Sequence, residues 1–516
     1  MYPAAPNSVC AILLAGVGGG SVLVFLVWLW GLCSWSSRAD DVPMVNRKAP
    51  GELLLTNAMR RWKADSKKII EEGFAKSSRG FYTITENGKE LVLGPQYANA
   101  VRNDKRFNFY AYRIRTLHSN ISGLDVFTLD EMGKKLMAYV IGRKLTKDLT
   151  NLIEPLSEEA GDALKKIWER DNQDNPAWHE VSVKESVLAI TSQQSTRIFL
   201  GIGFCRDQRW LQIATKVTVF AFQAVEMARM WPGILRPIVA RVIPTFQKLR
   251  AEVQNARDII NPIVEQRRRA KAKLAQQGDA PAPSLDALEW AEEFANGKKY
   301  DPAVLQLTIT LSAMHNTTDF MTQLIYDLAG RPELVSELRK EIVAVRTEFP
   351  WNKAAIFNLK LMDSVMKESQ RLKPTSLVSM RRIADTIIQL PDGLTVQKGD
   401  LVMVSTNNHW NQEVYENPDE FDPYRFYKML EHREWGSAAH MSSTSENHLG
   451  FGHGLWGCSG RFFAVAETKV ALCHILMKYD LKLLGDAPPV IRNGTFLSAN
   501  PFGKIAVRRR QEELEL

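Results

Sequence analysis

The stretch Phe451-Gly452-His453-Gly454-Leu455-Trp456-Gly457-Cys458-Ser459-Gly460-Arg461-Phe462-Phe463-Ala464 decides the fold of this chain. Several glycines precede one cysteine, and glycine lets a backbone turn tightly and approach a flat ligand closely. From Arg461 to about Lys478, apolar residues recur at helical spacing. Cys458 therefore lies at a helix N-terminus, where free N–H groups and the helix dipole favour an anion and lower the pKa of a thiol. The pattern predicts a metal-binding cysteine.

A lone cysteine is most often a small buried hydrophobic residue, and it is the residues around Cys458 that argue for a ligand. The stretch resembles the cysteine-ligand loop of the cytochrome P-450 superfamily, F-x-x-G-x-x-x-C-x-G, and matches it at Phe451, Gly454, Cys458 and Gly460. The resemblance implies that Cys458 is the axial ligand of a haem b iron. It also implies that the rest of this loop, Gly452 included, binds the haem.

Residues 302–329 are expected to form a long, very apolar helix. Within this helix, the hydroxyl of Thr317 can bond back to the carbonyl of Ala313 and bend the helix. The segment resembles the A/G-G-x-D/E-T-T motif of the same superfamily, which opens a groove for dioxygen and water over the haem. The resemblance assigns Thr317 and Asn316 to catalysis. Asn316 stands at the position of the acid and cannot relay a proton as a carboxylate would.

Glu368 and Arg371 lie three residues apart on a predicted helix and face the same side. Alone they would be an ordinary surface ion pair, worth ~0–1 kcal/mol. Together with Phe421-Asp422-Pro423-Tyr424-Arg425-Phe426 they resemble two further motifs of the superfamily, E-x-x-R and F-x-P-x-R-F. The resemblance implies that Glu368, Arg371 and Arg425 form a buried structural network with no catalytic role.

The haem propionates need cationic partners, and the usual ones are incomplete in this sequence. Leu455 and Trp456 stand where the superfamily commonly has a basic residue or histidine. Tyr139-x-x-x-Arg143 stands where it often has W-x-x-x-R, so Arg143 is either a propionate ligand or a solvated helix charge. By resemblance, Arg381 binds a propionate. We therefore expect haem retention to depend on Arg143 and Arg381.

The N-terminus is expected to be a membrane anchor. Residues 1–37 contain no charged residue, and Val9–Trp35 is long enough to cross ~30 Å of hydrocarbon as a helix. A cleaved signal peptide would carry a basic region at its start, and none is present. Basic residues follow the segment, which predicts a cytoplasmic catalytic domain on the endoplasmic reticulum membrane. A connector with prolines, residues 38–50, would join this anchor to a haem domain of residues 51–516.

The rest of the chain predicts a mainly α fold with small β-sheets, the cytochrome P-450 fold that the resemblance implies. Helices are expected at 52–75, 136–152, 208–230 and 242–274 (the last kinked at Pro262), a hairpin at 81–93, and irregular backbone at 107–128. The apolar link Met230–Pro237 is either a second membrane contact or part of the core. The net charge is +8, but no Lys/Arg run alternates with aromatics, which argues against nucleic acid as a partner.

No dinucleotide or flavin fingerprint is present, so the resemblance implies electrons from a separate NADPH-cytochrome P-450 reductase. It predicts a monooxygenase that uses O2 to oxidise a lipophilic small molecule. The stretches Val42-Pro43-Met44-Val45-Asn46-Arg47 and His315-Asn316-Thr317-Thr318 resemble fungal ent-kaurene oxidase-like and indole-diterpene hydroxylases, and this similarity favours a terpenoid of secondary metabolism. The expected pocket wall is apolar: Leu307, Leu311, Met314, Leu377, Val378, Phe496 and Leu497. The alternatives are a haem-thiolate isomerase or dehydratase without external electrons, and a non-enzymatic membrane-anchored haem- or sterol-binding protein.

Overall fold

The computed structural model describes residues 41–52, 54–169, 177–278, 284–433, 436–514 and 516. The predicted anchor and the first three residues of the connector lie outside this part. Among the described helices, none combines the length and apolar character needed to span a bilayer. The described end of the connector packs on the domain, because Val45 N donates to Tyr82 O (2.8 Å) and Tyr82 N donates to Pro43 O (2.9 Å).

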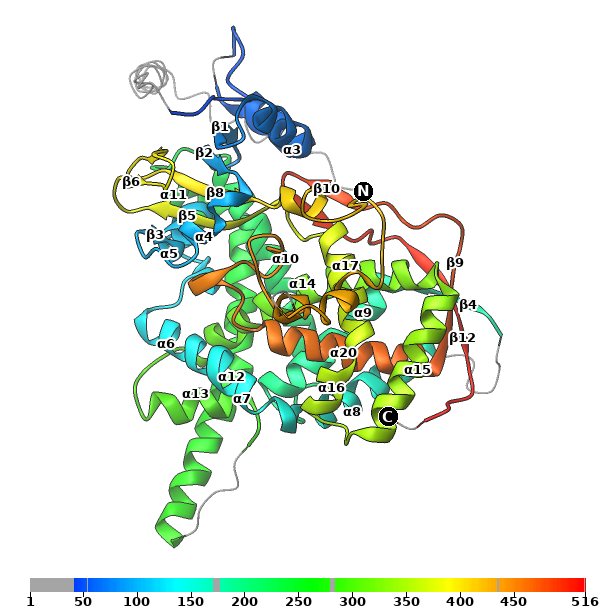
Figure 1. The fold of residues 1–516 in the computed structure, drawn as a ribbon. Helices are drawn as coiled ribbons and strands as arrows, with labels where there is room; N and C mark the ends of the chain where they lie inside the picture. Colours follow the sequence, from blue (N-terminus) through cyan, green and yellow to red (C-terminus); the bar gives the residue numbers. More distant parts are fainter. Residues whose placement is uncertain (1–40, 53, 170–176, 279–283, 434–435, 515) are drawn as a thin grey trace.

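The described chain is mainly helical, with small sheets towards the periphery (Figure 1). The longer helices are α3 Thr56–Lys76, α8 Leu149–Trp168, α9 Val183–Phe199, α10 Gln208–Arg229, α12 Pro244–Gln277, α14 Pro302–Ala329, α15 Pro332–Glu348, α17 Lys360–Leu372 and α20 Arg461–Lys478. The shorter helices are α4 Ala98–Val101, α5 Phe109–Thr116, α6 Glu131–Tyr139, α7 Leu145–Lys147, α11 Arg236–Val242, α13 Ala287–Ala295, α16 Lys353–Asn358, α18 Arg425–Met429 and α19 Gly436–Ala439.

Helix α14 is the centre of this arrangement. One side of it belongs to a core formed with α8, α9 and α20, and the other side to a core formed with α10 and α12. Asp301 caps its start, accepting from Val304 N (3.1 Å). A helix that is apolar nearly all round must be enclosed by other elements, which explains the long hydrophobic run in its sequence.

The largest sheet has the strand order β1-β2-β8-β5-β3. Its strands are β1 Gly80–Thr85, β2 Gly88–Leu93, β8 Leu401–Ser405, β5 Val378–Ala384 and β3 Phe107–Asn108. The predicted hairpin is confirmed as β1 and β2, with Gly88 at φ +103° in the turn. The smaller sheets pair β4 His179–Ser182 and β9 Tyr479–Leu483 with β12 Lys504–Arg509, β10 Ile491–Asn493 with β11 Phe496–Ser498, and β6 Ile388–Gln389 with β7 Thr395–Val396.

Two sequence-based expectations for the backbone were wrong. Residues 107–128 are not irregular throughout, because α5 forms there, capped by the Asn108 side chain, which accepts from Ala111 N at 2.9 Å. The helix expected at 136–152 is instead α6, a π-helical turn at Val140–Lys144, and α7, with α8 starting afresh after Asp148. Helix α12 continues through Pro262 as one element.

The link between α10 and α12 packs on the core only through part of α11, where Val239 and Ala240 are buried. It carries Met230, Ile234 and Ile238 with 73%, 83% and 58% of their surface exposed. An ion pair between Lys63 of α3 and Glu226 of α10 holds this end of α10 beside the first described helix. The exposed apolar link therefore lies at the same end of the molecule as the described start of the chain.

Candidate active site

The Cys458 loop is held in shape by its own backbone. Cys458 N donates to Phe451 O (2.7 Å), and Leu455 N donates to the carbonyl of Arg102 (3.0 Å). Gly454 has φ +73°, and a side-chain carbon there would lie 2.5 Å from that same carbonyl oxygen. Only glycine fits this position. The glycine at position 454 therefore lets the loop come close to the backbone of Arg102. This contact holds the loop with Cys458 just before α20.

A cavity of about 490 Å³ opens over the thiol of Cys458. Of the described cysteines, Cys458 alone is exposed, and Cys205 and Cys473 are buried. The loop residues that line the cavity include Phe451 and Gly460, whereas Gly452 and Gly454 shape the loop without lining it. The cavity therefore offers one accessible thiol as a metal ligand.

The sequence-based argument for a lowered thiol pKa was wrong for the protein without its metal. Burial raises the pKa of the Cys458 thiol above its ordinary value. The backbone N–H groups of Gly460 and Arg461 and the charge of Arg461 act in the opposite direction, but more weakly. Desolvation at the base of the cavity thus outweighs the helix N-terminus.

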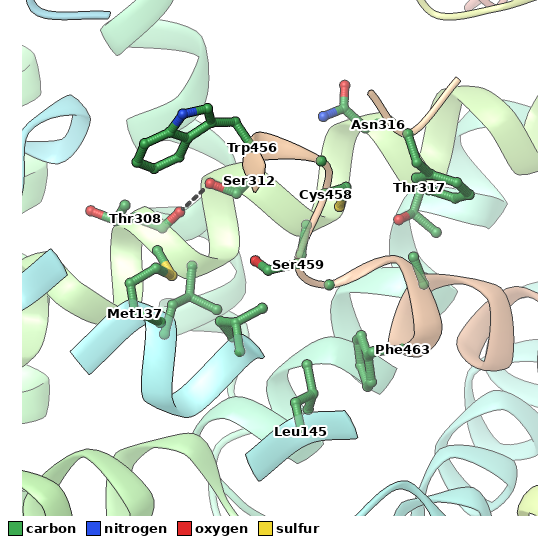
Figure 2. Close-up of a pocket in the computed structure, with 18 of the residues that line it drawn as sticks. Met137, Leu145, Thr308, Ser312, Asn316, Thr317, Trp456, Cys458, Ser459 and Phe463 are labelled. Atoms are coloured by element: carbon green, nitrogen blue, oxygen red, sulfur yellow. Dashed lines mark hydrogen bonds between the residues drawn. The ribbon is translucent and has the colours of Figure 1, made fainter. Parts of the chain in front are cut away.

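Helix α14 presents a polar stripe to the same cavity: Thr308, Ser312 and Asn316, one turn apart, with Thr317 beside them (Figure 2). The back-bond predicted for Thr317 is absent among the described residues, and Ser312 makes one instead, Oγ donating to the carbonyl of Thr308 at 2.8 Å. No described residue hydrogen-bonds to the side chain of Asn316 or to the Thr317 hydroxyl. Both are free to bind water or a ligand in the cavity.

Most of the remaining wall comes from segments before residue 200, and the rest from α14, α17, Thr375 and the start of α20. Apolar and aromatic side chains dominate the part before residue 200: Phe109, Tyr110 and Ile114 of α5, Phe127 and Leu129, Met137, Ala138, Ile141 and Leu145 of α6–α7, and Phe199. None of the seven wall residues expected from the sequence lines the cavity. Leu307, Leu311 and Met314 face the core with α10 and α12, and Leu377 and Val378 pack in a core beside β1 and β8. Figure 2 shows the α6–α7 side of the cavity with Met137 and Leu145.

The structure brings Glu368, Arg371 and Arg425 together. Arg371 Nε and Nη2 each donate to the Glu368 carboxylate at 2.8 Å, and Arg425 Nε donates to it at 3.1 Å. Glu368 and Arg371 are completely buried. Arg371 also donates to the carbonyl of Pro418 (2.6 Å), so the network fastens α17 to the segment that precedes α18.

The two arginines expected to hold the propionates do not reach the cavity. Arg143 lies within the π-helical turn Val140–Lys144, is exposed, and is not among the residues that line the cavity. Arg381 is engaged elsewhere, donating to Tyr112 Oη (3.3 Å) and to Thr495 Oγ1 (2.5 Å). The cations that do line the cavity, Arg113 and Lys134, lie in segments whose structure the sequence did not reveal.

A haem b fits these residues. An accessible thiol on a tight glycine loop forms the base of the cavity, and a polar helix face lies across from it. Arg113 also lines the cavity and has no carboxylate partner among the described residues. The thiol would bind the iron, and burial of the large apolar macrocycle would suit the aromatic walls. The described residues contain no cluster of three or more His, Cys, Asp or Glu side chains that could hold a metal by themselves.

Comparison with known proteins agrees with this geometry. The protein-family model described as cytochrome P450 matches residues 74–507. The chain is 50% identical to cytochrome P450 monooxygenase olcG of Penicillium canescens, over 98% of this chain and 97% of that one. It is 42% identical to cytochrome P450 monooxygenase esdpI of Penicillium shearii (92% of each chain) and 41% identical to cytochrome P450 monooxygenase adrA of Penicillium rubens (95% and 96%). The chain therefore belongs to the cytochrome P450 family and is a haem-thiolate monooxygenase.

Proposed function

We propose that this monooxygenase oxidises a lipophilic terpenoid or mixed-origin terpenoid in fungal secondary metabolism, with electrons from a membrane-bound NADPH-cytochrome P-450 reductase. The observation that carries the proposal is the cavity between Cys458 and α14, whose walls are mainly aromatic and aliphatic, with the polar stripe of α14 and a few other polar side chains such as Arg113 and Lys134. Its volume of about 490 Å³ is within the range of pockets that enclose drug-sized ligands. Such walls favour a bulky apolar skeleton.

When haem is bound, its thiolate-ligated iron supplies cleavage of the O–O bond and oxygen insertion. The chain contributes the environment of that reaction. The apolar walls orient the substrate and exclude water. The Thr317 hydroxyl and the Asn316 amide, neither of which has a hydrogen-bond partner among the described residues, can hold water on the α14 side of the cavity, and the hydroxyl can pass a proton from that water.

The direct test is product analysis with the purified protein, an NADPH-reductase and a panel of terpenoids. We expect a hydroxylated or further oxidised product from at least one terpenoid, dependent on both NADPH and O2. Turnover of fatty acids or small aromatics with all terpenoids left untouched would exclude the proposed substrate class. Conversion without NADPH would favour the isomerase or dehydratase alternative.

Replacing Thr317 by alanine is expected to uncouple NADPH consumption from product formation. Because Asn316 cannot supply a proton as a carboxylate would, we expect the Thr317 hydroxyl and its water to deliver most of the protons. Product formed per NADPH should fall roughly 10- to 100-fold, near the lower end of what a positioned proton donor contributes. The measurement is the ratio of hydrogen peroxide to oxidised product at equal NADPH consumption.

Thr322→Ala is the matched control for this prediction. Thr322 also lies in α14, its hydroxyl bonds the carbonyl of Thr318 (2.7 Å), and it does not line the cavity. Its replacement should leave the ratio unchanged. Asn316→Asp should lower the ratio below that of the natural protein. Equal ratios in the natural protein and the Thr317 variant would show that protons arrive by another route.

We also propose that the domain lies on the cytoplasmic face of the endoplasmic reticulum membrane, anchored by residues before 38 and touching the bilayer through the exposed apolar link. Deleting residues 1–38 should leave a peripheral membrane protein. Adding Ile234→Glu and Ile238→Glu should then weaken vesicle binding at least about 100-fold, because burying one such side chain is worth ~1.5–3 kcal/mol. Sedimentation with liposomes measures this.

The control is Ile202→Glu, since Ile202 is 66% exposed on a different link, between α9 and α10. It should bind vesicles like the truncated parent. If the truncated parent itself remains entirely in the supernatant at low salt, the apolar link makes no membrane contact.

A further inference from the structure

We propose that the end of the cavity bounded by Thr128, Thr308 and Ser312 binds a hydroxyl group of the substrate. The enzyme then acts on a terpenoid alcohol and discriminates against the corresponding hydrocarbon, a specificity that rests on the function proposed above. Three features of the structure lead to this site: the exposed positions of α14, the carbonyls that engage its hydroxyl protons, and an unpartnered hydroxyl on the neighbouring wall.

Helix α14 is buried along most of its length, but Ser312 and Asn316 are exposed. Both residues line the cavity, so the surface that they expose faces the cavity. A polar group that loses its water to an apolar ligand costs free energy unless another hydrogen bond replaces the lost one. The side of α14 that faces the cavity therefore favours a ligand that carries a polar group of its own.

Backbone carbonyls engage the hydroxyl protons at this end of the cavity. Ser312 Oγ donates to the carbonyl of Thr308 at 2.8 Å (Figure 2), and Thr308 Oγ1 donates to the carbonyls of Val304 (2.8 Å) and Val126 (3.0 Å). A hydroxyl has one proton and two acceptor lone pairs. The Ser312 oxygen therefore offers only lone pairs to the cavity, and its partner must be a donor. An alcohol has such a proton, whereas an ether or a hydrocarbon has none.

Thr128 supplies the complementary donor. The hydrogen bond from Thr308 to Val126 joins α14 to the neighbouring wall, and Thr128 follows two residues later in the chain. Thr128 lines the cavity, and its Oγ1 is buried with no partner among the described residues. Because no carbonyl engages its proton, this hydroxyl can donate to a ligand. A substrate hydroxyl can therefore accept from Thr128 and donate to Ser312, which uses both functions of an alcohol.

The spacing along α14 separates this site from the residues assigned to proton delivery. Ser312 precedes Thr317 by five residues, which is about 7.5 Å along a helix axis. The oxidised carbon is therefore expected several bonds away from the anchored hydroxyl, on another part of a large terpenoid skeleton. A reaction that leaves a hydroxyl on the skeleton, such as an earlier oxygenation or the reduction of a ketone, must supply the substrate.

The experiment titrates the purified ferric holoprotein with matched terpenoids and follows the shift of the Soret band on binding. The ligands are drimenol, geranylgeraniol and any terpenoid that is turned over in the product assay. Each alcohol is compared with its methyl ether and with the hydrocarbon that lacks the oxygen. Ser312→Ala and Thr128→Val should each raise the Kd of the alcohol about 3- to 10-fold, the loss of one hydrogen bond. Neither variant should change the Kd of the hydrocarbon.

Ile309→Val is the matched control, because Ile309 lines the same cavity and has no polar atom in its side chain. This variant should change the Kd of the alcohol and of the hydrocarbon by the same factor. The CO-bound spectrum shows whether each variant holds its haem. If Ser312→Ala does not, Thr128→Val decides the question alone. A mixture of products from Ser312→Ala, where the natural protein forms one, would also support a lost anchor.

Two kinds of result would contradict the hydroxyl site. A hydrocarbon that binds the natural protein as tightly as its alcohol, or polar variants that weaken both ligands equally, would overturn this site and leave the terpenoid function in place. If no terpenoid of the panel binds or is turned over, the proposed function fails, and the hydroxyl site fails with it.

Discussion

Cys458→Ser is expected to abolish the thiolate Soret band of the reduced, CO-bound protein and, with it, all monooxygenase activity. A serine hydroxyl has neither the charge nor the electron density of a thiolate, so cleavage of the O–O bond loses the push that drives it. The loss should exceed the effect of any other single substitution in the cavity, because no other described thiol is accessible. The measurements are the CO difference spectrum and product formation with reductase and NADPH.

Cys205→Ala serves as the control. Cys205 is buried, and its thiol bonds the carbonyl of Ile202 at 3.4 Å, outside the cavity. This variant should keep the band at its natural position and intensity per haem. A thiolate band that survives Cys458→Ser would mean that a different cysteine ligates the iron.

Glu368→Ala is expected to produce the largest loss of stability. It leaves Arg371, which is completely buried, and Arg425, which is nearly so, without their shared carboxylate. Removing one partner of a buried ion pair costs ~3–5 kcal/mol, and a domain has only ~5–15 kcal/mol to lose. We expect little folded protein at 37 °C and a much lower urea midpoint where some is recovered.

A nearby exposed ion pair provides the comparison. Lys428 lies 3.4 Å from Asp422 and keeps 70% of its side chain exposed. Lys428→Ala should change the free energy of unfolding by no more than ~1 kcal/mol. Urea unfolding of both variants, followed by circular dichroism, measures the difference. Equal stability of the Glu368 variant and the natural protein would show that solvent reaches the network.

Local sequence predicted those parts of the site that depend on a few adjacent residues. The loop around Cys458, the long helix carrying Thr317 and the pairing of Glu368 with Arg371 each follow from spacing within a short segment. The walls of the cavity could not be predicted this way. Helix α14 is apolar on both sides, so periodicity alone could not show that Leu307 and Met314 face a core while Ser312 and Asn316 face the cavity.

The surroundings of Arg381 and Arg143 could not be predicted for a related reason. The surroundings of Arg381 depend on a register shift between Ser379 and Arg382 of β5, and this shift is defined only by pairing with β8, a strand that is separate in the sequence. Arg143 lies in a π-helical turn, which no simple spacing rule indicates. The helix N-terminus similarly suggested a lowered thiol pKa, but burial, a property of the assembled fold, decides its direction.

The hydrogen bonds between the connector and β1 have a consequence for how the enzyme would meet its substrate. Because Pro43 and Val45 are hydrogen-bonded to Tyr82, the described start of the chain is fixed to the catalytic domain. An anchor close to this point would limit how far the domain can move away from the membrane. Substrate would then enter from the lipid bilayer and not from water. Across a series of analogues, the apparent KM should therefore fall as the lipid partition coefficient of the analogue rises.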